Sequence, residues 1–252
     1  MAGKVIAITG ANGGLGRALS RRFAADGEQV VMLGRSLAKV EEVAAAIGGN
    51  NLLPLACDLG DAASIAQAFA AIRERHGKLD VLINNAGSFL PFFIESASEA
   101  QIIAGLNANL VGPILCARAA IPLMGRGGQL IHVTSESVET RHAMLSIYQC
   151  GKAGLERFSR SMVEELAPRG IRSIIFRAGQ MHGEGHSTEM DPAIASVFYE
   201  QNVARALDPM PRGLSRYASA AQVMRNVVDL PLDISIDIVS CHSLPGEFVV
   251  PD

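Results

Sequence analysis

The sequence predicts an α/β protein with a doubly wound (Rossmann) parallel sheet of about seven strands and helices on both faces. Two observations predict this fold class. Short aliphatic runs alternate along the chain with segments of helical periodicity, and several of these runs, such as VLI and SIIF, are apolar without interruption. Alternating strands and helices form βαβ units with right-handed crossovers, and continuously apolar strands fit a sheet that is covered on both faces. No linker, repeat or low-complexity tract interrupts the pattern, so we expect residues 1–252 to form one domain.

Each expected element follows from local residue pattern. In residues 61–77, Ile65, Phe69 and Ile72 recur at helical spacing, and the helix around Tyr148 carries a similar apolar stripe that ends at Leu166. We expect the strands at residues 4–8, 29–33, 51–57, 79–84, 129–135, 171–176 and 234–240. The helices are expected from residue 14, from residue 36, over 61–77, over 109–124, around 148–166 and over 220–230, with a loop-rich segment at 180–215.

Composition excludes several classes of protein. With 49% hydrophobic and 19% charged residues, the chain has the composition of a compact globule rather than a disordered segment. A formal net charge of -3 gives no reason to expect nucleic acid or a membrane surface as partner. No apolar run reaches the roughly 18 residues that span a bilayer, and the start MAGKVIAITG has no signal-peptide pattern. The four cysteines lack metal-like spacing, so we expect reduced thiols and a cytoplasmic location.

Tyr148 and Lys152 lie four residues apart on a predicted helix, which places both side chains on one face. An ammonium beside a phenol favours the phenolate and lowers a pKa that starts at about 10. We therefore expect Lys152 to bring Tyr148 towards the range in which a general acid/base works at neutral pH. The alternative is a surface tyrosine and lysine that share a face by chance.

A glycine-rich turn, TGANGGLG, joins the first strand to the first helix. Glycines at this place let the backbone approach a pyrophosphate, and the helix N-terminus offers free N–H groups and the positive end of the helix dipole. The spacing is TGxxxGxG rather than GxGxxG. This turn predicts a dinucleotide-binding site, with these residues as contacts: Gly10, Asn12, Gly14, Leu15 and Gly16.

The end of the second strand indicates which dinucleotide is bound. An Asp or Glu at this place would bind the adenosine ribose of NAD, but the text VVMLGRS has no acid and instead has Arg35. Arg35, assisted by Ser36, is a candidate for binding the 2′-phosphate of NADP(H), which we expect in preference to NAD(H). The alternative is a solvated loop arginine. After the third strand, Asp58 either receives the adenine amino group or caps the next helix.

Five motifs together resemble the short-chain dehydrogenase/reductase (SDR) family over essentially the whole chain. They lie in the expected order and on the expected elements. The motifs are TGANGGLG at residues 9–16, NNAG at 84–87, Asn109 in LNANLVG, Ser135 in IHVTS, and YQCGK at 148–152, thirteen residues after Ser135. The resemblance implies a single dinucleotide-binding and catalytic domain whose lid, near residues 180–215, covers the substrate side.

The resemblance also implies residue roles. Tyr148 would exchange a proton with the substrate oxygen, and Ser135 would hold that oxygen and stabilise its developing charge. Lys152 would hydrogen-bond the nicotinamide ribose, and Asn109 would anchor a water that resupplies the proton. The alternative is a purely structural role for each residue: Ser135 ends a strand, and Asn109 caps or kinks a helix that Gly112 and Pro113 already disturb. Further implied cofactor contacts are Asp58, Leu59, Asn85, Ala86, Gly87, Tyr148, Lys152 and Gly179, with Asn84 and Asn85 read as scaffold amides that tie adjacent strands.

The chain departs from the family pattern at three places. Ala178 replaces the usual Pro of a Pro-Gly pair, and Gly183 stands where a threonine near the nicotinamide carboxamide is usual. Glu136 follows Ser135, where a small or apolar residue is more usual, and it points either into the pocket or to solvent. The C-terminus lacks the glycine-rich VDGG finish, which weakens any transfer of tetramer geometry. We still expect a homo-oligomer, either dimer or tetramer.

The substrate side is predicted to be apolar. Its expected walls carry Phe89, Phe92, Phe93, Met144, Met181, Met190, Phe198 and Met210, which favour an apolar carbonyl compound or its alcohol as substrate. His132, His142, His182 and His186 match no metal spacing, so we expect them to be solvated or at the substrate edge, and we expect no metal. The first hypothesis is an NADP(H)-dependent oxidoreductase that interconverts a ketone or aldehyde and an alcohol. The alternatives are a 3-oxoacyl-thioester reductase and a non-catalytic NADP(H)-binding regulatory or scaffold protein.

Overall fold

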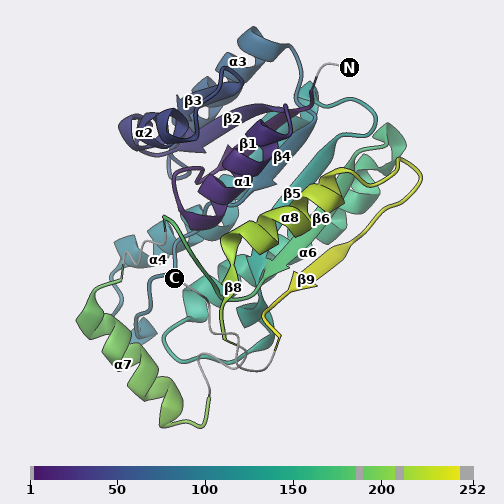
Figure 1. Ribbon diagram of the computed structural model, residues 1–252. Coiled ribbons are helices and arrows are strands. Elements are labelled where there is room, and N and C mark those ends of the chain that lie inside the picture. The colour runs from purple at the N-terminus through teal and green to yellow at the C-terminus, as the bar shows by residue number, and fades with distance from the viewer. Residues whose placement is uncertain (1–2, 186–189, 208–212, 245–252) are drawn as a thin grey trace.

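A seven-stranded, wholly parallel sheet forms the centre of the computed structural model, which describes residues 3–185, 190–207 and 213–244 (Figure 1). The strand order is β3-β2-β1-β4-β5-β6-β9, so the chain reverses direction of winding between β1 and β4. Such a reversal leaves a crevice at the carboxyl ends of the strands, where ligands bind in this architecture. The strands are β1 (Val5–Thr9), β2 (Gln29–Gly34), β3 (Leu52–Ala56), β4 (Val81–Asn84), β5 (Gln129–Ser135), β6 (Arg172–Ala178) and β9 (Ile238–Cys241).

Helices cover both faces of the sheet, as the alternating pattern predicts. On one face, side chains of α1, α2 and α8 join a core with Ile6, Ile8 and Phe176, and on the other face α3, α5 and α6 pack on Leu33 and Leu82. Both cores are fully buried at these strand positions. The helices are α1 (Gly14–Ala25), α2 (Leu37–Ile47), α3 (Ala62–His76), α4 (Glu99–Leu106), α5 (Gly112–Ala120), α6 (Ser146–Leu166), α7 (Pro192–Val203) and α8 (Tyr217–Val228).

The structure differs from the sequence-based expectation at four places. The loop-rich segment contains a helix, α7, which begins after Asp191, whose side chain accepts from the Ala193 N–H at 2.7 Å. A two-stranded ladder, β7 (Met181–His182) with β8 (Ser215–Arg216), encloses this segment. The helix expected from residue 109 begins at Glu99, where Ser98 and Gln101 form a reciprocal capping box. The last strand begins at Ile238 rather than residue 234.

Helices α4 and α5 are joined by a π-helical turn, η2 (Asn107–Val111), into one run from Glu99 to Leu123. A π-turn adds a residue to the turn and commonly marks a functional site. The run is 25 residues long and contains an 18-residue window with mean hydropathy 1.4, so by length and composition alone it could cross a membrane, contrary to the expectation that no apolar run is long enough. In this fold the run packs beside α3 and α6 as part of the helical layer.

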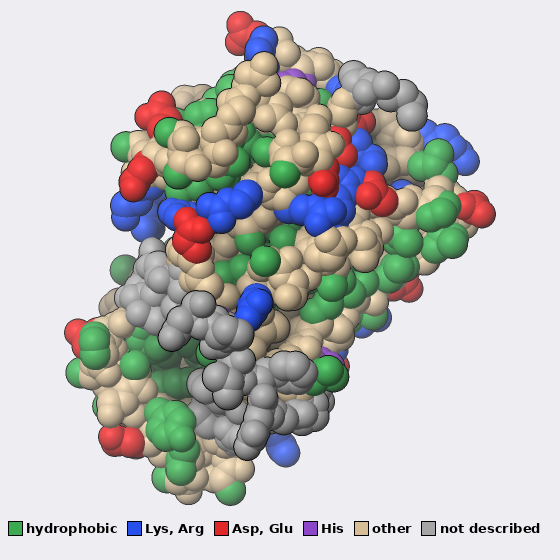
Figure 2. Space-filling view, in the orientation of Figure 1, with side chains coloured by type: hydrophobic (Ala, Val, Ile, Leu, Met, Phe, Trp, Pro, Cys, Tyr) green, Lys and Arg blue, Asp and Glu red, His purple; other side chains and the backbone are tan. Residues whose placement is uncertain are grey.

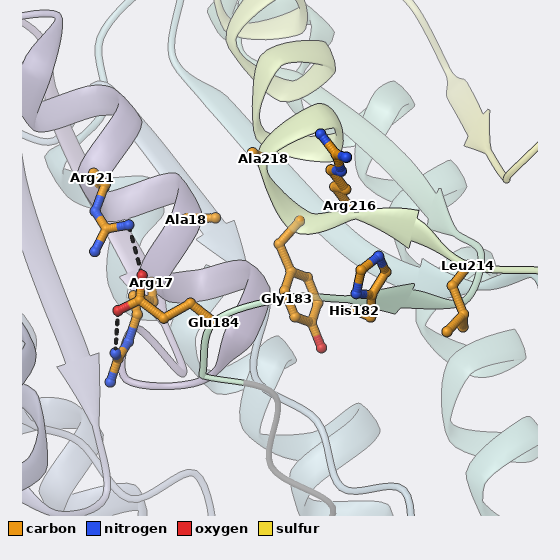
Figure 3. A pocket seen from close by; sticks show the side chains of 10 residues that line it. Arg17, Ala18, Arg21, His182, Gly183, Glu184, Leu214, Arg216 and Ala218 are labelled. Carbon is orange, nitrogen blue, oxygen red and sulfur yellow. Dashed lines mark hydrogen bonds and ion pairs between the residues drawn. The ribbon is translucent and has the colours of Figure 1, made fainter. Parts of the chain in front are cut away.

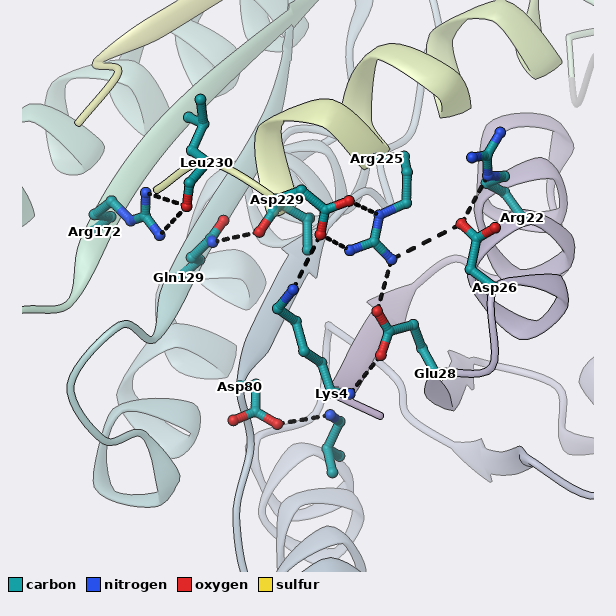
Figure 4. Close-up of polar contacts among 12 residues, drawn as sticks. Lys4, Arg22, Asp26, Glu28, Asp80, Gln129, Arg172, Arg225, Asp229 and Leu230 are labelled. Carbon is teal, nitrogen blue, oxygen red and sulfur yellow. Dashed lines mark hydrogen bonds and ion pairs between the residues drawn. The ribbon is translucent and has the colours of Figure 1, made fainter. Parts of the chain in front are cut away.

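The amino ends of the strands are braced by charged side chains that link distant segments (Figure 4). Arg225 of α8 is 5% exposed, and its guanidinium donates to Glu28 at 2.8 Å and to Asp229 at 2.7 Å. It also lies over the Phe23 ring, 5.0 Å from the centroid. Glu28 in turn accepts from the Lys4 N–H, so one buried arginine ties α8 to β2 and to the start of β1. The opposite end of the sheet is thus left free for a ligand site.

Candidate active site

The carboxyl ends of β1 and β4 are held together by Thr9. Its hydroxyl accepts from the N–H groups of Asn85 and Ala86, both at 3.0 Å. The Asn85 amide donates back to the Thr9 carbonyl at 2.9 Å, and Asn84 donates to the Pro113 carbonyl at 3.0 Å. The Asn85 bond to β1 agrees with the expectation that these amides tie adjacent strands. The Asn84 amide instead donates to α5, and it also lies 3.2 Å from His132 Nδ1 in the adjacent strand β5. Thr9 itself is a positioning residue that sequence analysis did not single out.

Asn109, Gly87 and Lys152 meet at one point. A Cβ placed on Gly87 would lie 2.9 Å from Asn109 Oδ1 and 3.0 Å from Lys152 Nζ, so only glycine leaves room for both side chains. Asn109 lies within the π-turn and is completely buried; its amide donates to Ser88 O at 2.9 Å and to Gly105 O at 3.0 Å. The structure therefore brings three predicted site residues together. Asn109 does not cap a helix, but it does lie in the irregular π-turn between α4 and α5.

Tyr148 and Lys152 share one face of α6, at the carboxyl end of β5. Lys152 Nζ lies 5.9 Å from the Tyr148 ring centroid and donates to the Val133 carbonyl at 3.0 Å. The Lys152 side chain is 3% exposed, whereas Tyr148 is half-buried. Ser135 ends β5, accepts from the Ser137 N–H at 3.2 Å, and lies close enough to the Tyr148 phenol to lower its pKa. The three side chains thus form a contiguous cluster.

Burial sets the proton affinities of this cluster. It raises the pKa of Tyr148, and the nearby Ser135 hydroxyl offsets this only in part. The sequence-based expectation was the opposite direction: a lysine on the same face was to lower the pKa. Loss of solvation disfavours the phenolate more than its neighbours favour it. Burial likewise lowers the pKa of Lys152 to about 8. At neutral pH the cluster therefore holds a protonated phenol beside an ammonium.

His132 is fully buried in β5, which contradicts the expectation of a solvated or substrate-edge residue. Its Nδ1 lies 3.2 Å from the Asn84 amide, and its ring packs edge-on against Phe158. Burial, together with the Lys152 charge, lowers the pKa of His132 to about 3, so the ring is neutral. Among the described residues no group of three or more His, Cys, Asp and Glu side chains is arranged to hold a metal.

A buried ion pair stands directly behind the cluster. Arg177, in β6, is 9% exposed and binds Glu156 of α6 through two contacts, Nε to Oε1 at 2.9 Å and a second nitrogen to Oε2 at 2.8 Å. The Thr134 hydroxyl donates to the same carboxylate at 2.9 Å, and Glu139 also contacts Arg177. Arg177 therefore links β6 to α6 one turn after Lys152 and to the segment that follows Ser135.

The glycine turn lies beside the ends of β1 and β2. Gly10 has a φ of 66°, and a Cβ there would lie 3.0 Å from Ala86 Cα. Gly13 is the N-cap of α1 and provides no side-chain hydrogen bond, which leaves the first-turn N–H groups for an anion. Asn12 Oδ1 lies beside Gly34, so the turn reaches the end of β2, where Arg35 and Ser36 are exposed. Arg35 has no hydrogen bond or ion pair with any described residue.

The other residues predicted to contact the cofactor differ in what they bind or pack against in the structure. The Asp58 carboxylate accepts from the Gly60 N–H at 2.9 Å, and Asp61 rather than Asp58 caps α3. Leu15 points into the core, so only its backbone faces the turn. Leu59 packs against Gly112, where a Cβ would lie 2.6 Å from it. Gly179 fits against β9, with its N–H donating to the Cys241 carbonyl at 2.7 Å.

A cationic cavity of about 630 Å³ lies outside the glycine turn, between α1, the start of α8 and residues 182–184 (Figure 3). Glu184 binds Arg17 and Arg21 of α1, each at 2.8 Å, which lowers the pKa of its carboxylate to about 2. Tyr217 fills the space beside Gly14: a Cβ there would meet its ring at 2.3 Å. Sequence analysis missed these residues because their contacts join segments far apart in the chain.

Aromatic and aliphatic side chains lie next to Tyr148. The Phe89 ring packs edge-on to Tyr148 with a centroid distance of 5.1 Å, and Phe198 of α7 packs edge-on to Phe89 at 5.9 Å. A cavity of about 280 Å³ adjoins them, lined by Tyr148, Asn109 and uncharged residues that include Leu90, Phe92 and Ile147. Met181 instead packs against the sheet core.

For Glu136, Gly183 and several histidines, the structure differs from the sequence-based expectation or tests it only in part. Glu136 is half-buried in the short 3-10 turn that Ser135 caps. Gly183 has a φ of 139°, and a Cβ there would lie 3.1 Å from Tyr217, so the missing threonine follows from backbone conformation. His182 is half-buried in the cationic cavity, and His142 packs against Phe198. His186 and Met210 lie outside the described residues.

The chain is similar to several known proteins. The family model for short chain dehydrogenase matches residues 4–191. Carbonyl reductase family member 4 of Danio rerio is 28% identical over 229 residues, which cover 90% of this chain and 92% of that protein. The 1,6-dihydroxycyclohexa-2,4-diene-1-carboxylate dehydrogenase of Pseudomonas putida is 32% identical over 237 residues, which cover 92% of this chain and 87% of the relative.

Solved structures agree with these matches. A short chain dehydrogenase from Burkholderia cenocepacia J2315, solved in complex with NADP, is 25% identical and superposes with a TM-score of 0.78, covering 94% of this chain and 96% of that one. The similarity thus extends over sheet and helices alike, while the family model takes in the glycine turn, Asn109, Ser135, Tyr148 and Lys152. The chain belongs to the short-chain dehydrogenase family of NAD(P)(H)-dependent oxidoreductases.

Proposed function

We propose that this protein is an NADP(H)-dependent oxidoreductase that reduces an uncharged, apolar ketone or aldehyde to its alcohol, with Tyr148 as the general acid. The observation that carries the proposal is the cluster of Ser135, Tyr148 and Lys152 beside an apolar cavity of about 280 Å³. The raised pKa of Tyr148 supports the direction of reduction, because a protonated phenol is ready to donate to a carbonyl oxygen.

The residues at the glycine turn fit a dinucleotide. The uncapped first turn of α1 would hold the pyrophosphate, and Asp58 would lie towards the adenine. Arg35 would bind the 2′-phosphate, because it is exposed and unpaired among the described residues and no acid stands beside it at the end of β2. The NADP complex of the Burkholderia relative supports this choice for that protein and, by analogy, for this one.

In the proposed reaction NADPH, when bound, supplies the hydride. The Ser135 and Tyr148 hydroxyls hold the substrate oxygen, and the Tyr148 hydroxyl donates the proton that converts the developing alkoxide to an alcohol. Lys152 places an ammonium behind the phenol, held by the Val133 carbonyl, and stabilises the phenolate left after donation. Asn109 fixes the backbone of Ser88 and faces Lys152 across Gly87.

A substrate screen tests the proposal most directly. Oxidation of NADPH and of NADH would be followed with butanone, cyclohexanone, acetophenone and an acetoacetyl thioester. We expect turnover of the uncharged ring ketones with NADPH. Turnover confined to the thioester would favour the 3-oxoacyl-thioester alternative. Tight NADPH binding without turnover of any carbonyl compound would favour a regulatory or scaffold protein and overturn the proposal.

An Arg35→Ala variant is expected to bind NADPH roughly 10–100-fold more weakly, because a hydrogen bond to a charged group contributes about 1.5–3 kcal/mol. NADH affinity should not change, since NADH lacks the 2′-phosphate. Fluorescence titration of both cofactors measures the two affinities. Arg118→Ala, which removes an exposed arginine from α5, is the matched control. Equal losses for NADPH and NADH would remove Arg35 from the 2′-phosphate site.

The pH profile should reflect Lys152. Its pKa of about 8 means that the ammonium is present below pH 8 and is lost as the pH rises through that value, so kcat/KM for reduction should fall above about pH 8. Tyr148, whose pKa is raised, would stay protonated over this range. In Lys152→Arg the charge persists, and the inflection near pH 8 should disappear from the remaining activity. A wild-type profile that stays flat to pH 10 would contradict this assignment.

A further inference from the structure

Asn202 is completely buried although the helix that carries it, α7, is largely exposed. Figure 2 shows hydrophobic side chains over this helix at the lower left, and Ile194, Val197, Tyr199 and Val203 are at least 40% exposed. A buried amide loses solvation, so it is stable only where its hydrogen bonds are satisfied. Asn202 therefore marks the place at which α7 is fixed to the body of the protein.

The side-chain amide of Asn202 both accepts from and donates to the backbone of Ala143. Its Oδ1 accepts from the Ala143 N–H at 2.9 Å, and its Nδ2 donates to the Ala143 carbonyl at 3.4 Å and to the Phe198 carbonyl at 2.8 Å. Ala143 lies in the segment that connects Ser135 to the start of α6, five residues before Tyr148. The Asn202 side chain thus hydrogen-bonds both the N–H and the carbonyl of Ala143, which precedes Tyr148 in the chain.

The backbone around Ala143 is held from a second side. Met144 has a φ of 66°, which is unfavourable for a residue other than glycine and persists only where the surroundings enforce it. Its carbonyl accepts from the Phe92 N–H at 2.9 Å. The segment is therefore held between α7 and the residues that follow β4, and the latter line the cavity beside Tyr148.

The same helix turn delivers an aromatic ring to Tyr148. Phe198 lies one turn before Asn202 and is 9% exposed. Its ring packs edge-on to Phe89 at 5.9 Å, and Phe89 packs edge-on to Tyr148 at 5.1 Å. Edge-on aromatic pairs hold a defined relative orientation. A shift of α7 therefore alters both the backbone before Tyr148 and the ring that contacts it.

We infer that Asn202 is a positioning residue for catalysis: its amide docks α7 on Ala143 and thereby sets the substrate wall formed by Phe89 and Phe198 beside Tyr148. The inference rests on the proposed function of this site and goes beyond it by assigning a role to a residue outside the family's motifs. An amide is required because it donates and accepts at once; a carboxylate accepts only, and an aliphatic side chain does neither.

Asn202→Leu and Asn202→Asp test the inference, with Glu200→Gln as matched control, since Glu200 is exposed on the same helix and contacts only Ser196 among the described residues. We expect both Asn202 variants to raise KM for cyclohexanone on the order of tenfold. NADPH affinity, which depends on the other side of the crevice, should stay unchanged. Unaltered KM in both variants would overturn the inference.

The pH dependence of Asn202→Asp separates positioning from a general structural defect. A buried carboxyl facing the Phe198 and Ala143 carbonyls has a raised pKa, and once protonated it can donate as the amide does. The ratio of its KM to the wild-type KM should therefore fall towards one as the pH is lowered from 8 to 5. The ratio for Asn202→Leu should stay constant. A constant ratio for Asn202→Asp over the same range would contradict the hydrogen-bonding role.

Hydrogen exchange at the Ala143 amide tests the role of Asn202 without any ketone turnover, so its outcome does not depend on the proposed function. The Ala143 amide resonance and its exchange with solvent report directly on the docking of α7. We expect faster exchange at Ala143 in Asn202→Leu than in Glu200→Gln or wild type. If no ketone is reduced but exchange changes as expected, only the proposed function fails; if ketones are reduced but neither exchange nor KM changes, the role of Asn202 fails.

Discussion

A Tyr148→Phe variant is expected to lose on the order of 10²–10⁴-fold in kcat for ketone reduction. The substitution removes the phenol hydroxyl, whose raised pKa keeps it protonated, and with it the proton for the substrate oxygen. A phenyl ring retains the edge-on contact with Phe89, so the fold and NADPH affinity should be preserved. Steady-state kinetics together with a cofactor titration measure both effects.

Tyr199→Phe is the matched control for this experiment. It makes the same chemical change on α7, where Tyr199 is 56% exposed and has no described role in the site. Its kcat should equal that of the wild type. If Tyr148→Phe and Tyr199→Phe were equally active, Tyr148 would not be the general acid, and the reaction would need another proton source.

Arg177→Met is expected to lower the free energy of unfolding by about 3–5 kcal/mol, because it leaves the buried Glu156 carboxylate without its partner. The Glu156 side chain is 9% exposed and accepts three hydrogen bonds, two of them from Arg177. The loss should be accompanied by lower activity, since Glu156 lies one turn after Lys152. Urea denaturation gives the stability, and kcat gives the effect on the site.

Two further variants define the origin of this loss. In Arg177→Met/Glu156→Met both charges are replaced by apolar groups, and most of the stability should return, because a buried ion pair contributes little relative to a packed apolar pair. Arg22→Met, which breaks an exposed pair with Asp26 on α1, should cost about 1 kcal/mol or less. A double variant as unstable as the single one would show that packing, rather than an unpaired charge, causes the effect.

The sequence predicts those features that depend on short-range pattern. Alternating apolar runs and helical stripes predict the sheet and six of its covering helices, because solvation decides which positions face inward. The glycine turn and the Tyr148–Lys152 spacing predict local geometry for the same reason. The capping box at Ser98 and Gln101 was equally local, and it would have placed the start of α4 correctly.

Other features depend on contacts that no local pattern encodes. Arg177 lies in an apolar strand and must have a partner, but only the fold shows that the partner is Glu156. His132 lies in an apolar strand too, and its position in the QLIHVTS run was a usable signal for burial. Helix α7 buries only Phe198 and Asn202 in the described structure, too little apolar surface to leave a periodic stripe. The pKa of Tyr148 is raised because the phenol is buried, and the spacing of Tyr148 and Lys152 in the sequence does not report burial.

The π-turn at Asn107–Val111 changes the direction in which side chains point before and after it along the long helix. The extra residue shifts the helical phase by about 100°. Before the turn α4 has no buried residue, whereas after it α5 buries Cys116, Ala117 and Ala120. The sequence pattern predicts a helix only from residue 109, where the chain builds one helical run of 25 residues. Within the turn, Asn109 is completely buried and faces Lys152 across Gly87, whereas Val111 is 41% exposed. One irregular turn thus separates an exposed helix from a partly buried one and carries the asparagine that faces Lys152.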